Sequence, residues 1–345
     1  MKKLALVLLT FVCTSQGQIV EQGKFLNDYR GIIHLHSELS HDSNGKFENI
    51  LSAAKNNRID FVLTTDHWSP TLYEKSNRGL IDNILFVAGA EISKNEGVTL
   101  IALPLPKDFV PEKDWRKNVT SLREKGSLAL ASHIEFSETS QLTGVDGIEM
   151  TNLHAMLVDR SYLGFALTWF RALWPQNWDL KYLFNSEILK NLPRWKYLNQ
   201  SLSLPAFAGN DTHDNYRLFY KLGPKLGSYE NTFKLITTHI WAWELSEQSV
   251  IEAIKNGQSY FAFEVFGYTK GFRFYAVNNK ILLQAPAHKE FKNTKLKILK
   301  DGKIVKEGNG ILLTFETKKE GNYYGEVWKN GNPWIFSNTV KIHSN

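Results

Sequence analysis

The sequence of 345 residues predicts an α/β protein, a barrel of parallel strands followed by a small β-sandwich. Between Gly31 and Asp211, short apolar runs alternate with segments of helical periodicity, which is the pattern of repeated βα units. A His, Asp or Glu residue follows each apolar run, as expected where strands end on one face of such a barrel. After about Gly267 the pattern changes to short alternating strands separated by hairpin dipeptides such as Asn330-Gly331.

The N-terminus predicts an export signal. Two lysines precede the ten-residue apolar run 4–13, and residues 15–17 (Ser-Gln-Gly) supply a small-residue cleavage site. The run is too short for a transmembrane span, which takes about 20 residues. We therefore expect a periplasmic or secreted protein, cleaved near Gly17. A lipoprotein anchored through Cys13 is the less favoured alternative, because the bulky Val12 precedes the cysteine.

The composition is that of a globular protein. Hydrophobic residues make up 43% of the chain and charged residues 22%, which excludes disorder, a collagen-like repeat and a coiled coil as the main class. The formal net charge of +6 falls to +4 without the first 17 residues, and no Lys/Arg block is present. This weak excess argues against a nucleic-acid partner. Because the single cysteine, Cys13, lies in the removable segment, we expect neither a disulfide nor a thiolate-bound zinc.

Six apolar runs are predicted as strands, each followed by polar residues able to bind a metal. The runs and those residues are 31–33 with His34 and His36, 61–64 with Asp66 and His67, 85–88 with Glu91, 128–131 with His133, 147–150 with His154, and 205–209 with Asp211 and His213. Helices are predicted over 47–54, from the spacing of apolar residues, and over 115–125, where Gly126 favours the C-terminal end. Because the carboxyl ends of parallel strands converge in a barrel, these polar residues are expected to share one pocket.

Two segments lie outside this alternation. Residues 155–200 combine four tryptophans with other aromatic residues in a helical-looking stretch of the barrel domain, which spans 25–268. They are predicted to form a helical insertion on the barrel rim or, alternatively, a lid over a bulky or lipid-like substrate. Residues 270–345 are predicted to form the β-sandwich, to which we assign no chemistry because it contains no clustered acids.

Nine residues are candidate metal ligands: His34, His36, His41, His67, Glu91, His133, His154, Asp211 and His213. In His34-Leu35-His36, the period of two aims both imidazoles to one side of a strand, and Asp211-Thr212-His213 repeats the spacing. Imidazole and carboxylate groups suit Zn²⁺, Mn²⁺ or Fe. Nine ligands exceed the needs of one metal, so we expect two or three divalent ions. Such clusters lower the pKa of bound water to about 7 and stabilise both oxygens of a displacement, which is the chemistry of phosphate-ester hydrolysis.

The motifs that carry a family resemblance lie between about residues 30 and 215. They are His34-Leu35-His36-Ser37-Glu38-Leu39-Ser40-His41-Asp42-Ser43, Thr65-Asp66-His67, Glu91, His133, Asn152-Leu153-His154 and Gly209-Asn210-Asp211-Thr212-His213. In type and order they resemble the motifs of the polymerase-and-histidinol-phosphatase (PHP) superfamily. Residues 245–257 and 334–338 resemble its exported branch, which includes carbaryl-hydrolase-like members with a C-terminal β-domain. The resemblance implies a distorted (β/α)7 barrel and a di- or trinuclear Zn, Mn or Fe site.

The resemblance also implies which residues share each ion. One ion would be held by His34, His36, Glu91 and Asp211; a second by Glu91, as a bridge, with His133 and His154; and a third by His41, His67 and His213. Asp42 is the alternative to His41, because the spacing in the family varies here by one residue. If neither binds, the site is binuclear.

Glu91 and Asp66 are the predicted catalytic residues. Glu91 is predicted to act as the bridging carboxylate, and Asp66 to orient an imidazole or, alternatively, to cap the loop that follows it. The leading functional hypothesis is an exported, metal-dependent phosphoesterase acting on a small-molecule or lipid-like phosphoester. One alternative is hydrolysis of an amide, ester or carbamate at the same site. Another is a non-catalytic metal-binding or surface-binding protein, against which the complete ligand set argues.

Overall fold

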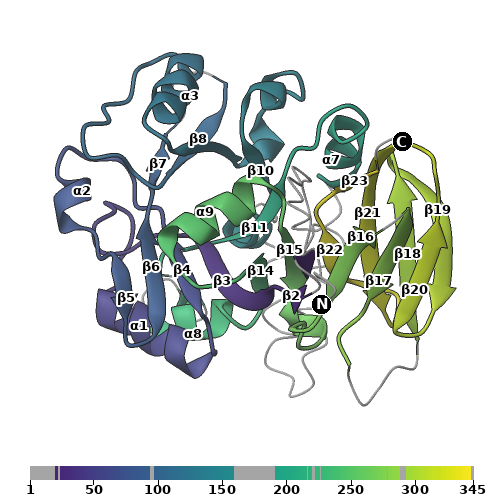
Figure 1. Ribbon diagram of the computed structural model, residues 1–345. Coiled ribbons are helices and arrows are strands. Elements are labelled where there is room, and N and C mark those ends of the chain that lie inside the picture. Colours follow the sequence, from purple (N-terminus) through teal and green to yellow (C-terminus); the bar gives the residue numbers. More distant parts are fainter. Residues whose placement is uncertain are drawn as a thin grey trace, which may run out of the picture.

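The computed structural model describes residues 20–21, 24–93, 97–158, 191–215, 217–219, 222–225, 227–277, 279–287 and 293–342. Figure 1 shows the arrangement of its strands and helices. The predicted export signal (1–17) and most of the predicted insertion (155–200) lie outside these residues. No described helix is long and apolar enough to cross a membrane.

The predicted (β/α)7 barrel is wrong, because the described structure is mostly β. Strand residues (41%) outnumber helical residues (22%), and most strands belong to one mixed sheet of 16 strands. Several neighbours in this sheet are antiparallel, among them β7 (Ala90–Ile92) with β8 (Thr99–Leu103), β8 with β9 (Leu128–Ser132), and β14 (Ile236–Ala242) with β3 (Asn27–Leu35). A (β/α)7 barrel requires helical crossovers between parallel strands, and antiparallel neighbours do not meet that requirement.

The parallel part of the sheet is built around β3. Parallel pairs join β3 to β4 (Phe61–Thr64), β4 to β6 (Ile84–Ala88), β3 to β11 (Ala206–Thr212), β11 to β10 (Gly147–Asn152), and β10 to β9. The register places Gly31 opposite Phe61 and Ile33 opposite Gly209. The carboxyl ends of these strands therefore meet at one edge, where ligands bind in open parallel sheets.

Gly89 alone separates β6 from β7, so the strand that pairs with β4 leads directly into the strand that pairs with β8. A Cβ atom at position 89 would lie 2.6 Å from the carbonyl oxygen of Ala102, which explains the glycine. This short connection places Glu91 of β7 beside His67, with which it forms an isolated parallel bridge.

The two helices predicted from periodicity are present as α1 (Phe47–Asn56) and α3 (Trp115–Glu124). The buried face of α1 packs into one apolar cluster with residues of β3, β4 and β6. Asp114 caps α3 by accepting a hydrogen bond from the backbone N–H of Arg116. α9 (Glu247–Lys255) follows β14 and begins with a capping box at Ser246. Among the residues that the structure describes, the other helical segments are α2 (Leu72–Lys75), α4 (Leu153–Val158), α7 (Leu192–Leu198), α8 (Tyr229–Thr232) and the 3₁₀ turns at Ile134–Phe136, Gln141–Gly144 and Glu264–Phe266.

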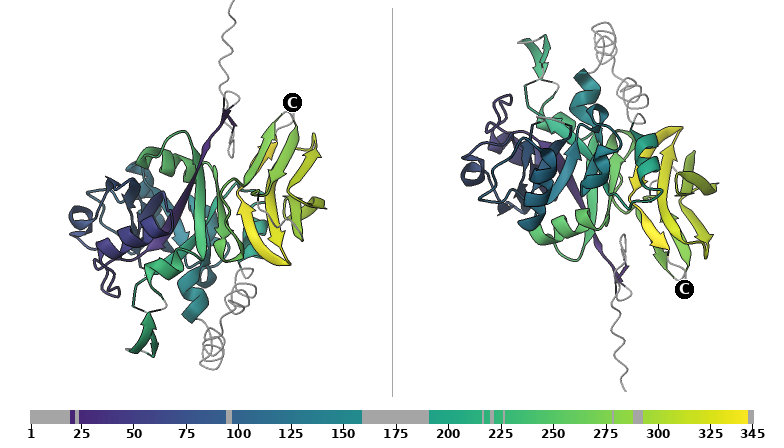
Figure 2. Two further views of the ribbon diagram at one scale, coloured as in Figure 1. Left: turned by 90° about the horizontal axis from the view of Figure 1, so that it is seen from below. Right: turned by 90° about the horizontal axis from the view of Figure 1, so that it is seen from above.

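The C-terminal strands continue the large sheet, because β15 (Ser259–Phe263) pairs with β22 (Asn332–Ser337). β22 is followed in the sheet by β21 (Gly321–Lys329), β18 (Thr294–Lys300) and β19 (Lys303–Asn309), with β23 (Val340–Ile342) on β21. A three-stranded sheet of β16 (Arg273–Val277), β17 (Lys280–Gln284) and β20 (Leu312–Glu316) packs against them, so that a Cβ on Gly325 would lie 2.8 Å from Leu283. Figure 2 shows these strands on one side of the molecule, away from α1 and α3.

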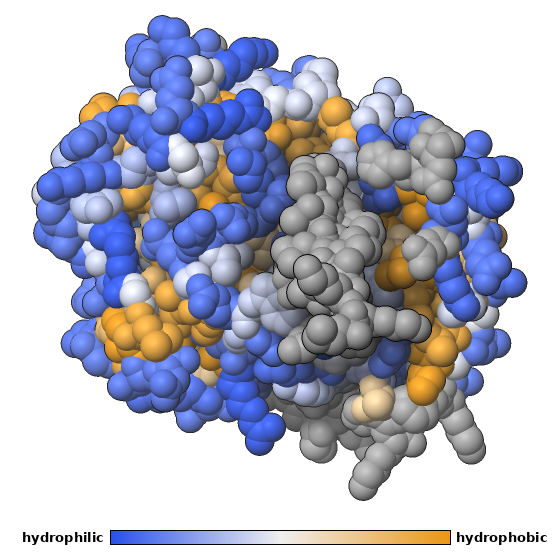
Figure 3. All heavy atoms as spheres, in the orientation of Figure 1, coloured by the Kyte–Doolittle hydropathy of each residue, from blue (hydrophilic) through white to orange (hydrophobic). Residues whose placement is uncertain are grey.

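The small strands are β1 (Val20–Glu21), β2 (Lys24–Phe25), β5 (Gly79–Ile81), β12 (Arg217–Phe219) and β13 (Leu222–Lys225). The face of the molecule drawn in Figure 3 is mainly hydrophilic, with an apolar area over the part that contains β5 and α1. β5 carries Leu80, whose side chain is exposed.

Candidate metal centre

The edge where the parallel strands end carries a cluster of His, Asp and Glu side chains. They come from β3 and the residue after it (His34, His36), the loops after β4 and β9 (His67, His133), β7 (Glu91), the first turn of α4 (His154), and β11 and the residue after it (Asp211, His213). Eight of the nine predicted ligands thus lie together, because the sheet brings the ends of strands distant in sequence to one place.

Four groups within this cluster could hold a metal ion, since their ligand atoms lie within 4.8 Å of one another. The groups are His34, His36 and Asp211; His36, Asp42, His67 and His213; His154, Asp211 and His213; and His34, His133 and Glu149. The groups share members, so the cluster is one connected centre.

Glu91 lies in the middle of the centre, between four imidazoles. Its carboxylate oxygens are 3.7 Å from Nε2 of His34, 3.5 Å from Nε2 of His36, 3.2 Å from Nδ1 of His67 and 3.3 Å from Nε2 of His133. The side chain is buried. Oε1 faces His34 and His133, and Oε2 faces His36 and His67. The role of Glu91 as a bridge between two ions stays a prediction.

Asp211 is the second buried carboxylate. Oδ1 lies 3.4 Å from Nε2 of His34 and 3.2 Å from Nε2 of His36, and Oδ2 lies 3.5 Å from Nε2 of His133. Asn152 donates a hydrogen bond to Oδ2 at 3.1 Å. Asp211, His34 and His133 all have positive φ angles (47°, 63° and 48°). Left-handed backbone is unfavourable for non-glycine residues and gathers at functional sites, so the surrounding structure holds these three residues in place.

Hydrogen-bond partners behind the imidazoles determine which nitrogen faces the centre. Nδ1 of His34 lies 2.6 Å from Oε1 of Glu149, and Nδ1 of His36 lies 3.0 Å from Oγ of Ser40. Nδ1 of His213 lies 2.9 Å from the backbone oxygen of Asp211, to which it donates. Nε2 of each imidazole therefore points inward. Partners of this kind fix the tautomer of metal-binding histidines.

The atoms of the centre that are buried without a hydrogen-bond partner include Nε2 of His34, Nε2 of His36 and Oδ1 of Asp211. Buried polar atoms are almost always satisfied, because leaving one unpaired costs about 1–3 kcal/mol. A cation bound between two imidazoles and a carboxylate would satisfy all three atoms. The donor set therefore fits a metal ion.

The imidazoles of the centre keep its two buried carboxylates ionised. Burial acts to raise the pKa of Glu91, but the nearby imidazoles of His133 and His34 outweigh it and hold that pKa well below its ordinary value. Burial likewise acts to raise the pKa of Asp211, and the nearby imidazoles of His34 and His36 hold it well below its ordinary value. For His133, burial acts to lower the pKa, but hydrogen bonds to Glu135 and Glu91 raise it to about 11, so a metal ion would have to displace a proton from this imidazole. Both central carboxylates are thus negatively charged at neutral pH.

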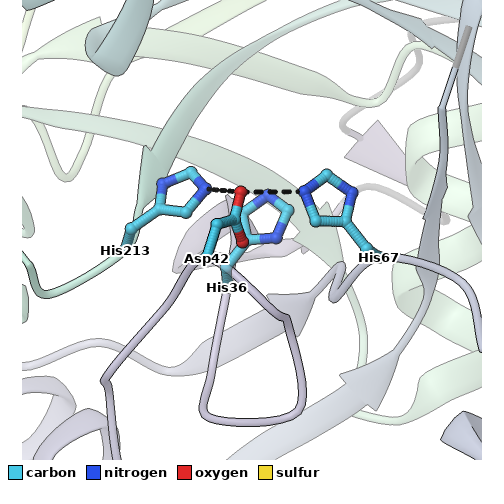
Figure 4. A group of neighbouring side chains, drawn as sticks. All are labelled: His36, Asp42, His67 and His213. Carbon is cyan, nitrogen blue, oxygen red and sulfur yellow. Dashed lines mark hydrogen bonds and ion pairs between the residues drawn. The ribbon is translucent and has the colours of Figure 1, made fainter.

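Asp42, the predicted alternative to His41, is grouped with His36, His67 and His213, and His41 is in none of the four groups. Oδ2 of Asp42 lies 3.0 Å from Nε2 of His67 and 3.2 Å from Nε2 of His213. Figure 4 shows Asp42 between these two imidazoles, next to His36. His41 is exposed, and its ring stands 4.8 Å from that of His67. The loop is not extended here: a turn from Ser37 to Ser40 precedes Asp42, and a second turn from Ser40 to Ser43 contains it.

His154 lies on a different side of the centre from the one we predicted. It groups with Asp211 and His213, and its ring centroid lies 4.8 Å from that of His213. His133, its predicted partner, faces Glu91 and Asp211 instead. Burial lowers the pKa of His154 and that of His213, the latter to about 4, so both imidazoles are neutral at pH 7 and able to bind a cation.

Asp66 lies behind the imidazoles and reaches them through a serine. Its carboxylate accepts hydrogen bonds from N–H and Oγ of Ser37, at 2.6 and 2.8 Å, and from Oγ of Ser40 at 2.9 Å. Ser40 Oγ in turn accepts from Nδ1 of His36 and from the backbone N–H of His67. The geometry therefore supports an orienting role for Asp66 through Ser40, and not direct contact with an imidazole.

Glu149 is a member of the centre that was not among the predicted site residues. This residue lies on β10, is buried, and contacts His34, His133 and Asn152. One signal in the sequence could have indicated it. Glu149 is a carboxylate within the apolar run 147–150, and a carboxylate in a buried strand is rare unless it has a partner.

The centre opens into a cavity of about 420 Å³. Besides the metal-binding candidates, its lining contains three neutral polar residues, Ser93, Thr99 and Asn215. Comparison of the chain with models of protein families and with curated proteins finds no match. The function is therefore inferred from the chemistry of the centre and its cavity.

Proposed function

We propose that the protein is an exported, metal-dependent hydrolase, and specifically a phosphoesterase. The observation that carries the proposal is the convergence of two ionised carboxylates, Glu91 and Asp211, with the unpartnered Nε2 atoms of His34 and His36. Both carboxylates also line the cavity. The order of the sequence motifs, which resembles the PHP superfamily, adds support. The export signal that places the enzyme in the periplasm or outside the cell remains a prediction.

Two or three divalent ions fit this centre, and Zn²⁺, Mn²⁺ and Fe suit its donors. One ion would be held by His34, His36 and Asp211, a second by Glu91 and His133, and a third by Asp42, His67 and His213. When bound, such ions polarise a phosphoryl oxygen and lower the pKa of bound water to about 7.

The residues of the chain supply charge balance and orientation. Glu91 and Asp211 offset part of the positive charge, which leaves an excess to attract an anionic phosphoester. Asp66 holds Ser40, and Ser40 accepts the Nδ1 proton of His36, which keeps Nε2 of that imidazole directed inward. Ser93, Thr99 and Asn215 line the cavity and supply neutral groups that can hydrogen-bond a substrate.

The test is a hydrolysis panel on protein loaded with Zn²⁺ or Mn²⁺, using a phosphomonoester, a phosphodiester and a carboxyl ester, with metal measured per chain. We expect two or more ions per chain and turnover of at least one phosphoester. Turnover of the carboxyl ester alone would support amide, ester or carbamate hydrolysis instead. A chain that binds metal but hydrolyses none of the three would contradict the proposed enzyme activity.

A further inference from the structure

The buried carboxylate of Glu149 belongs to one of the four groups, but it lies on the Nδ1 side of His34, whereas Nε2 of His34 faces Glu91 and Asp211. Oε1 of Glu149 lies 2.6 Å from Nδ1 of His34. Oε2 accepts hydrogen bonds from the backbone N–H of His133 at 2.9 Å and from Nδ2 of Asn152 at 3.1 Å. Asn152 also donates to Oδ2 of Asp211, so the contacts of this carboxylate reach three candidate ligands on separate strands or loops.

Both oxygens of Glu149 act as acceptors, and this determines where the proton of His34 lies. Because a carboxylate oxygen can only accept, Nδ1 of His34 carries the proton of this hydrogen bond, which leaves Nε2 as the nitrogen that can bind an ion. Nε2 faces Asp211 at 3.4 Å and Glu91 at 3.7 Å. A carboxylate at full burial is costly unless several donors satisfy it, as they do here.

We propose that Glu149 is a positioning residue of the metal centre, which keeps Nε2 of His34 directed at the ion shared with His36 and Asp211. The inference rests on the proposed metal centre but not on the reaction catalysed there. It predicts that loss of the Glu149 carboxylate weakens this one ion and spares the ion held by Asp42, His67 and His213.

Substitution of Glu149 with Gln tests the proposal with little change in shape. A carboxamide has one acceptor oxygen, and the N–H groups of His133 and Asn152 both require an acceptor at the position of Oε2. The amide nitrogen then faces Nδ1 of His34 and donates to it. His34 must accept that hydrogen bond, so its proton moves to Nε2, where it blocks the ion.

The experiment compares wild type, Glu149→Gln and Glu326→Gln by Zn²⁺ competition titration and by nitrogen NMR of ¹⁵N-histidine-labelled protein. Glu326 is the matched control, a buried carboxylate on β21 outside the centre. We expect Glu149→Gln to bind one Zn²⁺ equivalent about 10–100-fold more weakly and to shift the His34 proton from Nδ1 to Nε2. Glu326→Gln is expected to change neither.

Wild-type Zn²⁺ affinity and an unchanged His34 tautomer in Glu149→Gln would overturn the inference while leaving the metal centre intact. If Glu149→Gln does not fold, the wild-type spectrum decides, with His34→Ala to assign the signal. In Zn²⁺-loaded wild type, a His34 proton on Nδ1 supports the inference and one on Nε2 overturns it. A wild-type chain that binds no Zn²⁺ would contradict the proposed centre and this inference together.

Discussion

A Cβ atom at position 209 would lie 1.6 Å from Oε1 of Glu149. β10 and β11 pair in parallel, with Asn152 opposite Gly209, so the missing side chain on one strand makes room for the carboxylate of the other. Glu149 is buried, and its carboxylate is held by three donors. Position 209 must therefore be a glycine, because any side chain there would displace the Glu149 carboxylate that contacts His34.

Gly209→Ala is therefore expected to lower the free energy of unfolding by at least about 1–3 kcal/mol, since the interior must shift to admit a methyl group. The folded protein should also bind the ion shared by His34, His36 and Asp211 more weakly, because Glu149 is displaced from His34. Urea unfolding in excess chelator measures the loss of stability, and Zn²⁺ titration measures the loss of affinity. Gly144→Ala is the control, because a Cβ there would lie 3.5 Å from Trp115, an ordinary contact. Equal unfolding free energies for the two variants would contradict the close approach.

Asp42→Ala is expected to lose about one metal equivalent per chain, and His41→Ala to keep the wild-type content. The reason is the position of Asp42 Oδ2, within 3.2 Å of Nε2 atoms of both His67 and His213, whereas His41 is exposed. Elemental analysis after reloading with Zn²⁺ measures the difference. Loss of the equivalent in His41→Ala, with Asp42→Ala unaffected, would restore His41 as the ligand.

The sequence predicted the clustering of the site better than the fold. Polar residues that follow apolar runs, such as His34 and Asp211, could be expected to converge wherever the strands are parallel, and their strands do pair in parallel. Apolar periodicity identifies strands but not their direction, so the antiparallel pair β7–β8 was missed. That direction depends on the short connections around β7, where Gly89 joins it to β6.

The choice between His41 and Asp42 has the same kind of cause. The loop that carries them turns from Ser37 to Ser40 and again from Ser40 to Ser43, and a sequence pattern does not show which side chain such turns direct inward. Glu149 escaped notice because its partners, His34 and the backbone of His133, lie more than ten residues away in sequence and come together only through the sheet.

Glu91→Gln is expected to lower turnover by about 100-fold or more while leaving the fold intact. Glu91 lies within 3.7 Å of four imidazoles and carries the negative charge between them, and an amide cannot neutralise two cations. Turnover of the best phosphoester and thermal unfolding measure activity and fold. Glu38→Gln, an exposed change in the loop after His36, is the control. Retention of more than about a tenth of wild-type turnover would exclude the bridging role, because loss of a supporting residue alone costs roughly 10–100-fold.

A second buried charged network lies at the other end of β3, away from the metal centre. His239 of β14 places Nδ1 2.8 Å from Oδ1 of Asp28 and Nε2 3.3 Å from Oε1 of Glu264. Arg30 pairs with Glu264 at 3.0 Å, and Tyr260 donates a hydrogen bond to Asp28 at 2.9 Å. Since both imidazole nitrogens face carboxylates, His239 is held as an imidazolium between them.

The free energy of unfolding is therefore expected to fall at both ends of the pH range. Burial acts to lower the pKa of His239, but Asp28 and Glu264 raise it above its ordinary 6.5. The charged imidazole therefore stabilises the folded state fully below pH 6.5, and this stabilisation is lost as pH rises through the raised pKa. Burial acts to raise the pKa values of Asp28 and Glu264, but His239 holds them below their ordinary values of 3.8 and 4.5, respectively. The stabilisation by these two carboxylates is lost as pH falls through the lowered pKa values.

Urea unfolding from pH 3 to 10 should give a maximum in the free energy of unfolding between these limits. Excess chelator in the buffer removes the linkage to metal binding. His239→Gln should be about 3 kcal/mol less stable at neutral pH, because it leaves buried carboxylates without their cation, and should lack the alkaline decline due to His239. A wild-type profile that runs parallel to that of His239→Gln above pH 6.5 would show that His239 is not held as a cation by this network.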